Sequence, residues 1–182
     1  MSGFFVGANA VKLEQLYNLI GPDMQAVDAV IRTRLHSDVA LVRQVAEYII
    51  QSGGKRLRPA LVLLAAGALG CRGAHHHELA AVVEFIHTAT LLHDDVVDES
   101  DLRRGRKTAN AMFGNAASVL VGDFLYSRAF QMMVGVGNMR VMQVLSSATN
   151  IIAEGEVLQL MNCHDADVDE QRYLQVIRYK TA

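Results

Sequence analysis

The sequence has few of the residues that mark several protein classes. Its 182 residues include 2 cysteines, 2 prolines and no tryptophan. Cys71 and Cys163 lie far apart without a CxxC or zinc-finger spacing, which argues against a disulfide scaffold and favours a reducing compartment. The 17 lysines and arginines nearly balance the 19 aspartates and glutamates. This balance excludes a nucleic-acid binder that works by bulk charge and a polybasic membrane anchor.

Long apolar runs are missing as well. The longest nearly uncharged apolar stretch, residues 59–70, is too short to span a bilayer. Residues 1–10 lack the basic and apolar regions of a signal peptide. We therefore expect a cytoplasmic protein without a transmembrane segment. With 51% hydrophobic and 20% charged residues, the composition is that of a globular protein, and the length predicts a single domain over residues 1–182.

Apolar residues recur at helical spacing along nearly the whole chain. Val42, Val45, Ala46 and Ile49, for example, share one helix face. The same spacing predicts helices over residues 22–36, 39–51, 59–70, 78–98, 116–134, 139–161 and from 170 onward. No segment alternates with a period of two, so the predicted fold class is all-α. The last helix has no C-capping residue, so we expect the bundle to be incomplete at its C-terminus.

An acidic run near the end of the 78–98 helix gives the strongest chemical signal. Asp94 and Asp98 lie one helical turn apart on one face, and Asp95 and Glu99 repeat that spacing. Each like-charged pair costs about 0.2–0.5 kcal/mol in an isolated helix, so the cluster needs cations. Carboxylate oxygens favour Mg²⁺, with Mn²⁺ as an alternative, and Mg²⁺ completes its shell with water and substrate phosphates. A solvated acidic helix end is the competing interpretation.

Two basic runs and several histidines accompany the acidic run. Gly53-Gly54-Lys55-Arg56-Leu57-Arg58-Pro59 places three cations after a glycine pair, and residues 103–107 form a second cationic loop. Arginine side chains in such loops suit bidentate phosphate binding. His87 lies seven residues before Asp94, on the same stripe of the helix. For His75, His76 and His77 we expect a solvated loop before the next helix, with metal binding as the less favoured alternative.

Together these motifs resemble those of one enzyme family. Gly53–Pro59, Asp94-Asp95-Val96-Val97-Asp98 and Arg103-Arg104-Gly105 resemble the GGKxxRP, DDxxD and RRG motifs of trans-polyprenyl diphosphate synthases. Lys180-Thr181 is similar to the family's Lys-Thr pair. The resemblance covers essentially the whole chain, although the family's second aspartate-rich motif has no match.

The resemblance implies an isoprenoid synthase-type helical bundle and a Mg²⁺-dependent prenyltransferase. Such an enzyme condenses isopentenyl diphosphate onto an allylic diphosphate such as farnesyl diphosphate, as a homodimer, for quinone side-chain biosynthesis. By the resemblance, isopentenyl diphosphate would be bound by Lys55, Arg58, His87 and Arg104. The allylic diphosphate would be contacted by Arg103, Lys180 and Thr181, and Asp94 and Asp98 would hold Mg²⁺, with Asp95 in support. Asp94, Asp98 and Lys180 would carry catalysis, and we expect the 182-residue chain alone to be inactive.

Two other functions and the product length stay open at this point. A class I terpene cyclase handles one diphosphate and would leave Lys55, Arg58 and His87 without a role. A non-catalytic subunit of a heteromeric prenyl synthase could lack the metal aspartates, which are present here. In the family, bulky residues four or five positions before the first aspartate shorten the product. The small Ala89 and Thr90 therefore imply a long product near the octaprenyl size, limited by bulkier residues among Phe124, Phe130, Met132 and Met133.

Overall fold

The structure, a computed structural model, describes residues 13–51, 53–71 and 73–181. The N-terminal residues considered for a signal peptide lie outside these ranges. The chain forms two compact units, residues 1–132 and 133–182, and each is described by itself. The predicted all-α class is confirmed, since the described residues form helices and one short hairpin. No described helix is long and apolar enough to cross a membrane.

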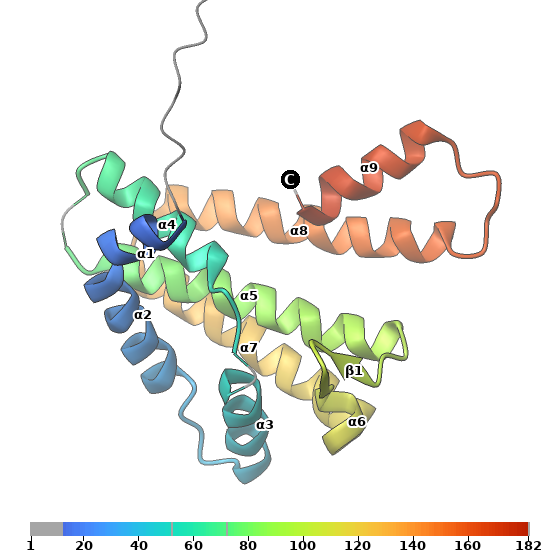
Figure 1. Ribbon diagram of the computed structural model, residues 1–182, viewed down its shortest axis with the longest axis horizontal. Coiled ribbons are helices and arrows are strands. Elements are labelled where there is room, and N and C mark those ends of the chain that lie inside the picture. Colours follow the sequence, from blue (N-terminus) through green and yellow to red (C-terminus); the bar gives the residue numbers. More distant parts are fainter. Residues whose placement is uncertain (1–12, 52, 72, 182) are drawn as a thin grey trace, which may run out of the picture. The chain divides into compact units, whose positions relative to one another are not determined.

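Seven of the described helices lie wholly or mostly in the first unit (Figure 1). The last of them, α7, extends a few residues past residue 132. They are α1 (Leu13–Leu19), α2 (Gly21–Arg34), α3 (Ala40–Gln51), α4 (Leu57–Ala68), α5 (His75–Val97), α6 (Ala109–Phe113) and α7 (Asn115–Val136). A two-stranded antiparallel hairpin of β1 (Leu102–Arg103) and β2 (Arg106–Lys107) follows α5. The second unit contains α8 (Met139–Asn162) and α9 (Glu170–Thr181).

Helix α5 is the centre of the first unit. It packs against α2, α4 and α6, and its alanines Ala80, Ala81 and Ala89 are completely buried. Such small side chains let neighbouring helices approach closely. The hydroxyl of Ser118 on α7 donates to the Leu92 carbonyl of α5 at 3.0 Å, which links the two helices inside the core. The helix predicted over residues 78–98 is therefore present, and it lies in the core of the first unit.

The structure differs from the sequence-based expectation at several places. The short helices α1 and α6 were not predicted. Helix α5 begins at His75, so the solvated loop expected at His75–His77 is wrong, because these residues form the first helical turn. Helix α4 begins at Leu57, two residues before Pro59, and its N-cap Arg56 has a left-handed conformation with φ 47°. The hairpin β1–β2 was not predicted, because strands of two residues are too short to show a periodicity.

In the second unit, α9 packs closely on α8 at Gly155. A Cβ atom built on Gly155 would lie 2.8 Å from Cβ of Tyr179 and 2.9 Å from the backbone nitrogen of Lys180. The side chain of Asp169 caps α9 by accepting from the Arg172 backbone nitrogen at 2.7 Å. Gly155 therefore sets the distance at which the turn containing Lys180 lies from α8.

We predict that Gly155→Ala separates the end of α9 from α8. Because the added methyl group meets backbone atoms rather than a movable side-chain end, we expect a destabilisation of about 1–3 kcal/mol. Urea denaturation would measure the loss, and amide hydrogen exchange would show faster exchange in α9. Gly135→Ala is the matched control, since nothing lies within 4 Å of that helical glycine. Equal stability of the two variants would contradict the prediction.

Candidate functional site

A cavity of about 770 Å³ opens in the first unit beside α5. Its wall combines two kinds of side chain. Apolar groups come from several helices: Ile31, Leu35, Ala46, Ile49, Phe85, Leu91, Leu92 and Leu125. Cationic groups come from the two basic segments: Lys55, Arg56, Arg58, Arg103, Arg104, Arg106 and Lys107. The lining carboxylates are Glu84 and Asp95, so positive charge is in clear excess.

The glycine pair shapes one side of the cavity by receiving an arginine. Gly53 has φ 64°, a conformation that strongly favours glycine. Nη1 of Arg104 donates to the Gly53 carbonyl at 2.9 Å, and a Cβ on Gly54 would lie only 2.8 Å from that same nitrogen. In the structure the Gly53-Gly54 pair allows Arg104 of the hairpin to pack directly against the turn.

Each of the two carboxylates in the cavity holds one arginine. Nη1 of Arg56 donates to Glu84 at 3.1 Å, and burial raises the pKa of Glu84 although Arg56 and Arg58 oppose that rise. Arg103 grips Asp95 through three hydrogen bonds of 2.7–3.2 Å. Removing one partner of a buried ion pair costs about 3–5 kcal/mol, and the Asp95 side chain is only 6% exposed. Both pairs are therefore structural parts of the wall.

His87 is neutral and faces the remaining cations. Nη1 of Arg58 lies 3.1 Å from Nε2 of His87. Because a guanidinium can only donate, Nε2 accepts and the ring hydrogen is on Nδ1. Burial, followed by the charges of Arg58, Arg104 and Arg103, lowers the pKa of His87 to about 4. The imidazole thus offers an N–H donor without adding another positive charge.

Two tyrosines that the sequence analysis did not select hold the backbones of the basic segments. The hydroxyl of Tyr17 on α1 donates to the carbonyl of Lys55. The hydroxyl of Tyr48 on α3 donates to the carbonyl of Lys107 at 2.5 Å. No local motif marks either residue, because each reaches its partner across more than 35 positions of sequence. Glu84, by contrast, could have been selected as a lone carboxylate in an apolar helix, three residues before His87.

Asp94 and Asp98 lie at the end of α5 but are not among the cavity-lining residues. Asp98 is the C-cap, and its backbone nitrogen donates to the Asp94 carbonyl at 2.8 Å, so the two residues are one helical turn apart, as predicted. Asp94 is half-buried and Asp98 exposed. Glu84, His87, Leu91 and Asp95 line the cavity from α5. Helical spacing places Asp94 about 20° around the helix from His87, on the same stripe, as the sequence predicts.

The other residues selected from the sequence lie outside the cavity. Ala89 is fully buried, and Thr90 donates its hydroxyl to the His87 carbonyl at 2.8 Å. In the second unit, Nζ of Lys180 lies 2.7 Å from both Glu156 and Gln159, and Thr181 ends α9. The structure thus brings Lys55, Arg58, His87, Arg103 and Arg104 together in the first unit.

Comparison with known proteins adds three kinds of likeness. The family model described as Polyprenyl synthetase matches residues 39–182. The octaprenyl diphosphate synthase of Escherichia coli K12 is 59% identical over 94% of this chain and 53% of its own length. A solved decaprenyl diphosphate synthase from Rhodobacter capsulatus matches with TM-score 0.87 and 54% identity, over 92% of this chain and 52% of that one.

A second similar solved structure is a complex with ligands. It is a polyprenyl synthase from Caulobacter crescentus, described as complexed with calcium and isoprenyl diphosphate. It matches with TM-score 0.91 and 48% identity, over 95% of this chain and 53% of that one. This chain therefore spans about half the length of the relatives that it matches.

We predict that the pKa of His87, followed by NMR of the imidazole carbon-bound hydrogens, is about 4 rather than 6.5. The imidazole binds a proton more weakly in the folded state than in the unfolded state. The free energy of unfolding should therefore fall as the pH is lowered from 6.5 toward 4. Inorganic diphosphate should raise this pKa, since an anion among Arg58, Arg103 and Arg104 offsets their charge. Titration near pH 6.5 in the free chain would contradict the assignment.

Proposed function

The chain belongs to the polyprenyl synthetase family, and on that premise we propose that it forms part of a long-chain trans-polyprenyl diphosphate synthase. The reaction would condense isopentenyl diphosphate onto an allylic diphosphate, with a product near the octaprenyl size. One observation carries the proposal: seven cationic side chains line one cavity, and its two carboxylates are both engaged by arginines. Such an excess of positive charge calls for a polyanionic ligand.

Isopentenyl diphosphate is the ligand that fits this cavity. Lys55, Arg58 and Arg104 would neutralise the diphosphate, and the Nδ1 hydrogen of neutral His87 would add a donor. The apolar wall, which includes Phe85 and Leu125, suits a short hydrocarbon group. The cationic and the apolar side chains line the same cavity, as a ligand with a charged head and an apolar tail requires.

The residues of the acidic run fit a magnesium site. Asp94 and Asp98 lie one turn apart and supply carboxylate oxygens, the donors that Mg²⁺ prefers. Asp95 is buried and turned to Arg103, so it would support the site without binding the ion. Mg²⁺, or Mn²⁺, would supply electrostatic stabilisation of the departing diphosphate. Arg103, Lys180 and Thr181 would add contacts to the allylic diphosphate, as the resemblance implies.

In the reaction, the allylic carbon–oxygen bond breaks, and the diphosphate leaves with the electron pair. The double bond of isopentenyl diphosphate then attacks the allylic cation, and loss of a proton restores a double bond. The cavity residues would hold isopentenyl diphosphate beside the metal-bearing stripe of the same helix, α5. Catalysis by this part of the chain would therefore consist of alignment and charge stabilisation.

The two alternative functions are not favoured. A terpene cyclase would have no use for a second anion site, and here that site is the cavity of Lys55, Arg58 and His87. A non-catalytic subunit would have no use for Asp94 and Asp98. Homodimerisation is proposed from the resemblance. We propose the cytoplasm as the compartment, since Cys71 and Cys163 are free, as thiols are in reducing compartments.

We predict that Arg58→Ala weakens the binding of isopentenyl diphosphate to the chain by about 10- to 100-fold, because one charged hydrogen-bond donor is lost. Asp98→Asn should leave this binding within twofold and abolish the Mg²⁺ dependence of farnesyl diphosphate binding. Isothermal titration calorimetry measures both. Arg32→Ala, on an exposed face of α2, is the control. If Asp98→Asn weakens isopentenyl diphosphate more than Arg58→Ala does, the two sites must be exchanged.

A second prediction concerns product length, in an active enzyme that contains this chain. Ala89→Phe and Thr90→Phe should shorten the product sharply, because each adds a ring beside the path of the growing chain. Ala89 is fully buried, so its variant also risks overpacking, and thermal midpoints should be measured for both. Chromatography of the products decides: unchanged lengths in a stable Thr90→Phe variant would contradict the prediction.

A further inference from the structure

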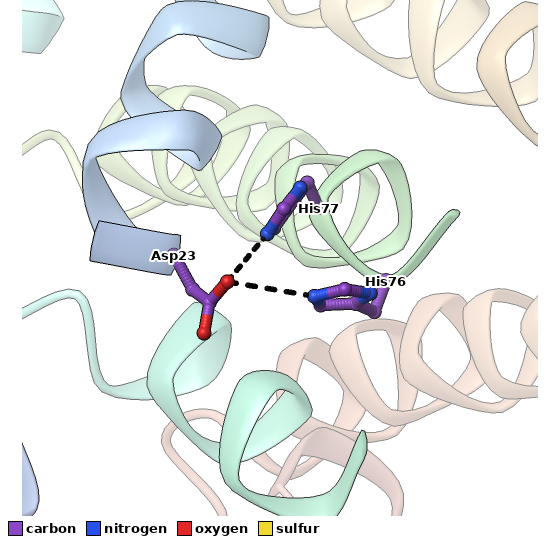
Figure 2. A group of neighbouring side chains, drawn as sticks. All are labelled: Asp23, His76 and His77. Atoms are coloured by element: carbon purple, nitrogen blue, oxygen red, sulfur yellow. Dashed lines mark hydrogen bonds and ion pairs between the residues drawn. The ribbon is translucent and has the colours of Figure 1, made fainter. Parts of the chain in front are cut away.

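A second cluster of metal-binding groups lies outside the cavity, where the first turns of α2 and α5 meet (Figure 2). Nε2 of His77 lies 2.8 Å from Oδ1 of Asp23, and Nε2 of His76 lies 3.7 Å from the same oxygen. One ligand atom from each residue lies within 4.8 Å of the other two. The histidine side chains are only 18% and 19% exposed, so the group is set into the surface rather than spread over it.

The arrangement is unusual for a simple ion pair. The two imidazole rings are side by side, with centroids 4.0 Å apart, and both turn toward one carboxylate. Two adjacent imidazolium groups would repel each other, and the N-terminal ends of both helices oppose positive charge on the rings. The two imidazole nitrogens and the carboxylate oxygen thus converge on one point of the surface.

The donor set points to a particular class of ion. Two imidazole nitrogens and one carboxylate oxygen suit zinc and similar divalent transition metals, whereas Mg²⁺ prefers oxygen ligands. With metal–ligand distances near 2.1 Å, tetrahedral geometry places ligand atoms about 3.4 Å apart. The observed separations from Asp23, 2.8 and 3.7 Å, fall on either side of that value, so small side-chain rotations complete the site.

We propose that Asp23, His76 and His77 bind a zinc-type divalent cation that joins the start of α2 to the start of α5. A water molecule would take the fourth position. On binding, the hydrogen now on Nε2 of His77 moves to Nδ1, so the ring keeps one proton while Nε2 becomes a ligand. His77 lies about 26 Å along α5 from Asp94, which makes this ion structural and separate from the reaction metal. The proposal does not depend on the proposed function.

The test is a titration of the tag-free, chelator-treated 182-residue chain with Co²⁺, an optical substitute for zinc. We expect visible d–d bands of a four- or five-coordinate site, and their loss when Zn²⁺ is added. Since even outer-sphere partners are worth about 10- to 100-fold in metal affinity, His77→Ala and His76→Ala should each weaken binding at least about tenfold. His75→Ala is the matched control, because this exposed neighbour in the same turn lies outside the cluster.

Other outcomes would overturn the proposal. A thiolate-to-cobalt charge-transfer band would assign the ion to Cys71 or Cys163. Loss of the bands in an Asp94→Asn, Asp98→Asn double variant would assign it to the acidic end of α5. If His77→Ala is too unstable to titrate, thermal unfolding provides a second test. Zn²⁺ should raise the unfolding midpoint of the parent and of His75→Ala, and leave that of His76→Ala unchanged. An equal rise in His76→Ala would show that the ion binds elsewhere.

Discussion

Repulsion among cations is the constraint on which the first unit depends. Seven lysine and arginine side chains face one cavity, and in the absence of a ligand their charges oppose the folded state. Two carboxylates offset part of this repulsion, since the half-buried Glu84 holds Arg56 and the buried Asp95 holds Arg103. Burial is the main cause of the low pKa of His87, and the charges of Arg58, Arg104 and Arg103 lower it further, which reflects the repulsion that remains. An anionic ligand would relieve this unfavourable energy, which makes its binding stronger.

The backbone around the cavity also holds these cationic residues in place. Arg56 and Arg104 both have positive φ values, 47° and 54°, which cost energy for residues other than glycine. Each is held in place by a specific partner, Arg56 by Glu84 and Arg104 by the Gly53 carbonyl. The hydroxyls of Tyr17 and Tyr48 hold the segments that carry Lys55 and Lys107. The cations are therefore positioned before a ligand arrives, and less conformational entropy is lost on binding.

The sequence predicted the parts of this arrangement that follow from local pattern. Helical periodicity located α2, α3, α5, α7 and α8 within a few residues, and motif spacing selected Lys55, Arg58 and His87. It could not predict partners that meet across long stretches of chain, such as Tyr48 with Lys107 or Asp23 with His77. It also placed His75–His77 in a loop, because three consecutive polar residues show no helical periodicity. In the structure this segment is the first turn of α5, and α5 packs on α2.

The two arginines of the Arg103-Arg104-Gly105 motif contact two different parts of the first unit. They are adjacent in sequence, yet Arg103 turns to Asp95 on α5 and Arg104 turns to the glycine turn before α4. Gly105, with φ 77°, completes the reversal of the hairpin that directs them apart. A lysine at position 103 could supply the charge but not the planar guanidinium that donates to both oxygens of Asp95. The hairpin therefore ties α5 to the segment before α4, and the cavity lies between the elements that it joins.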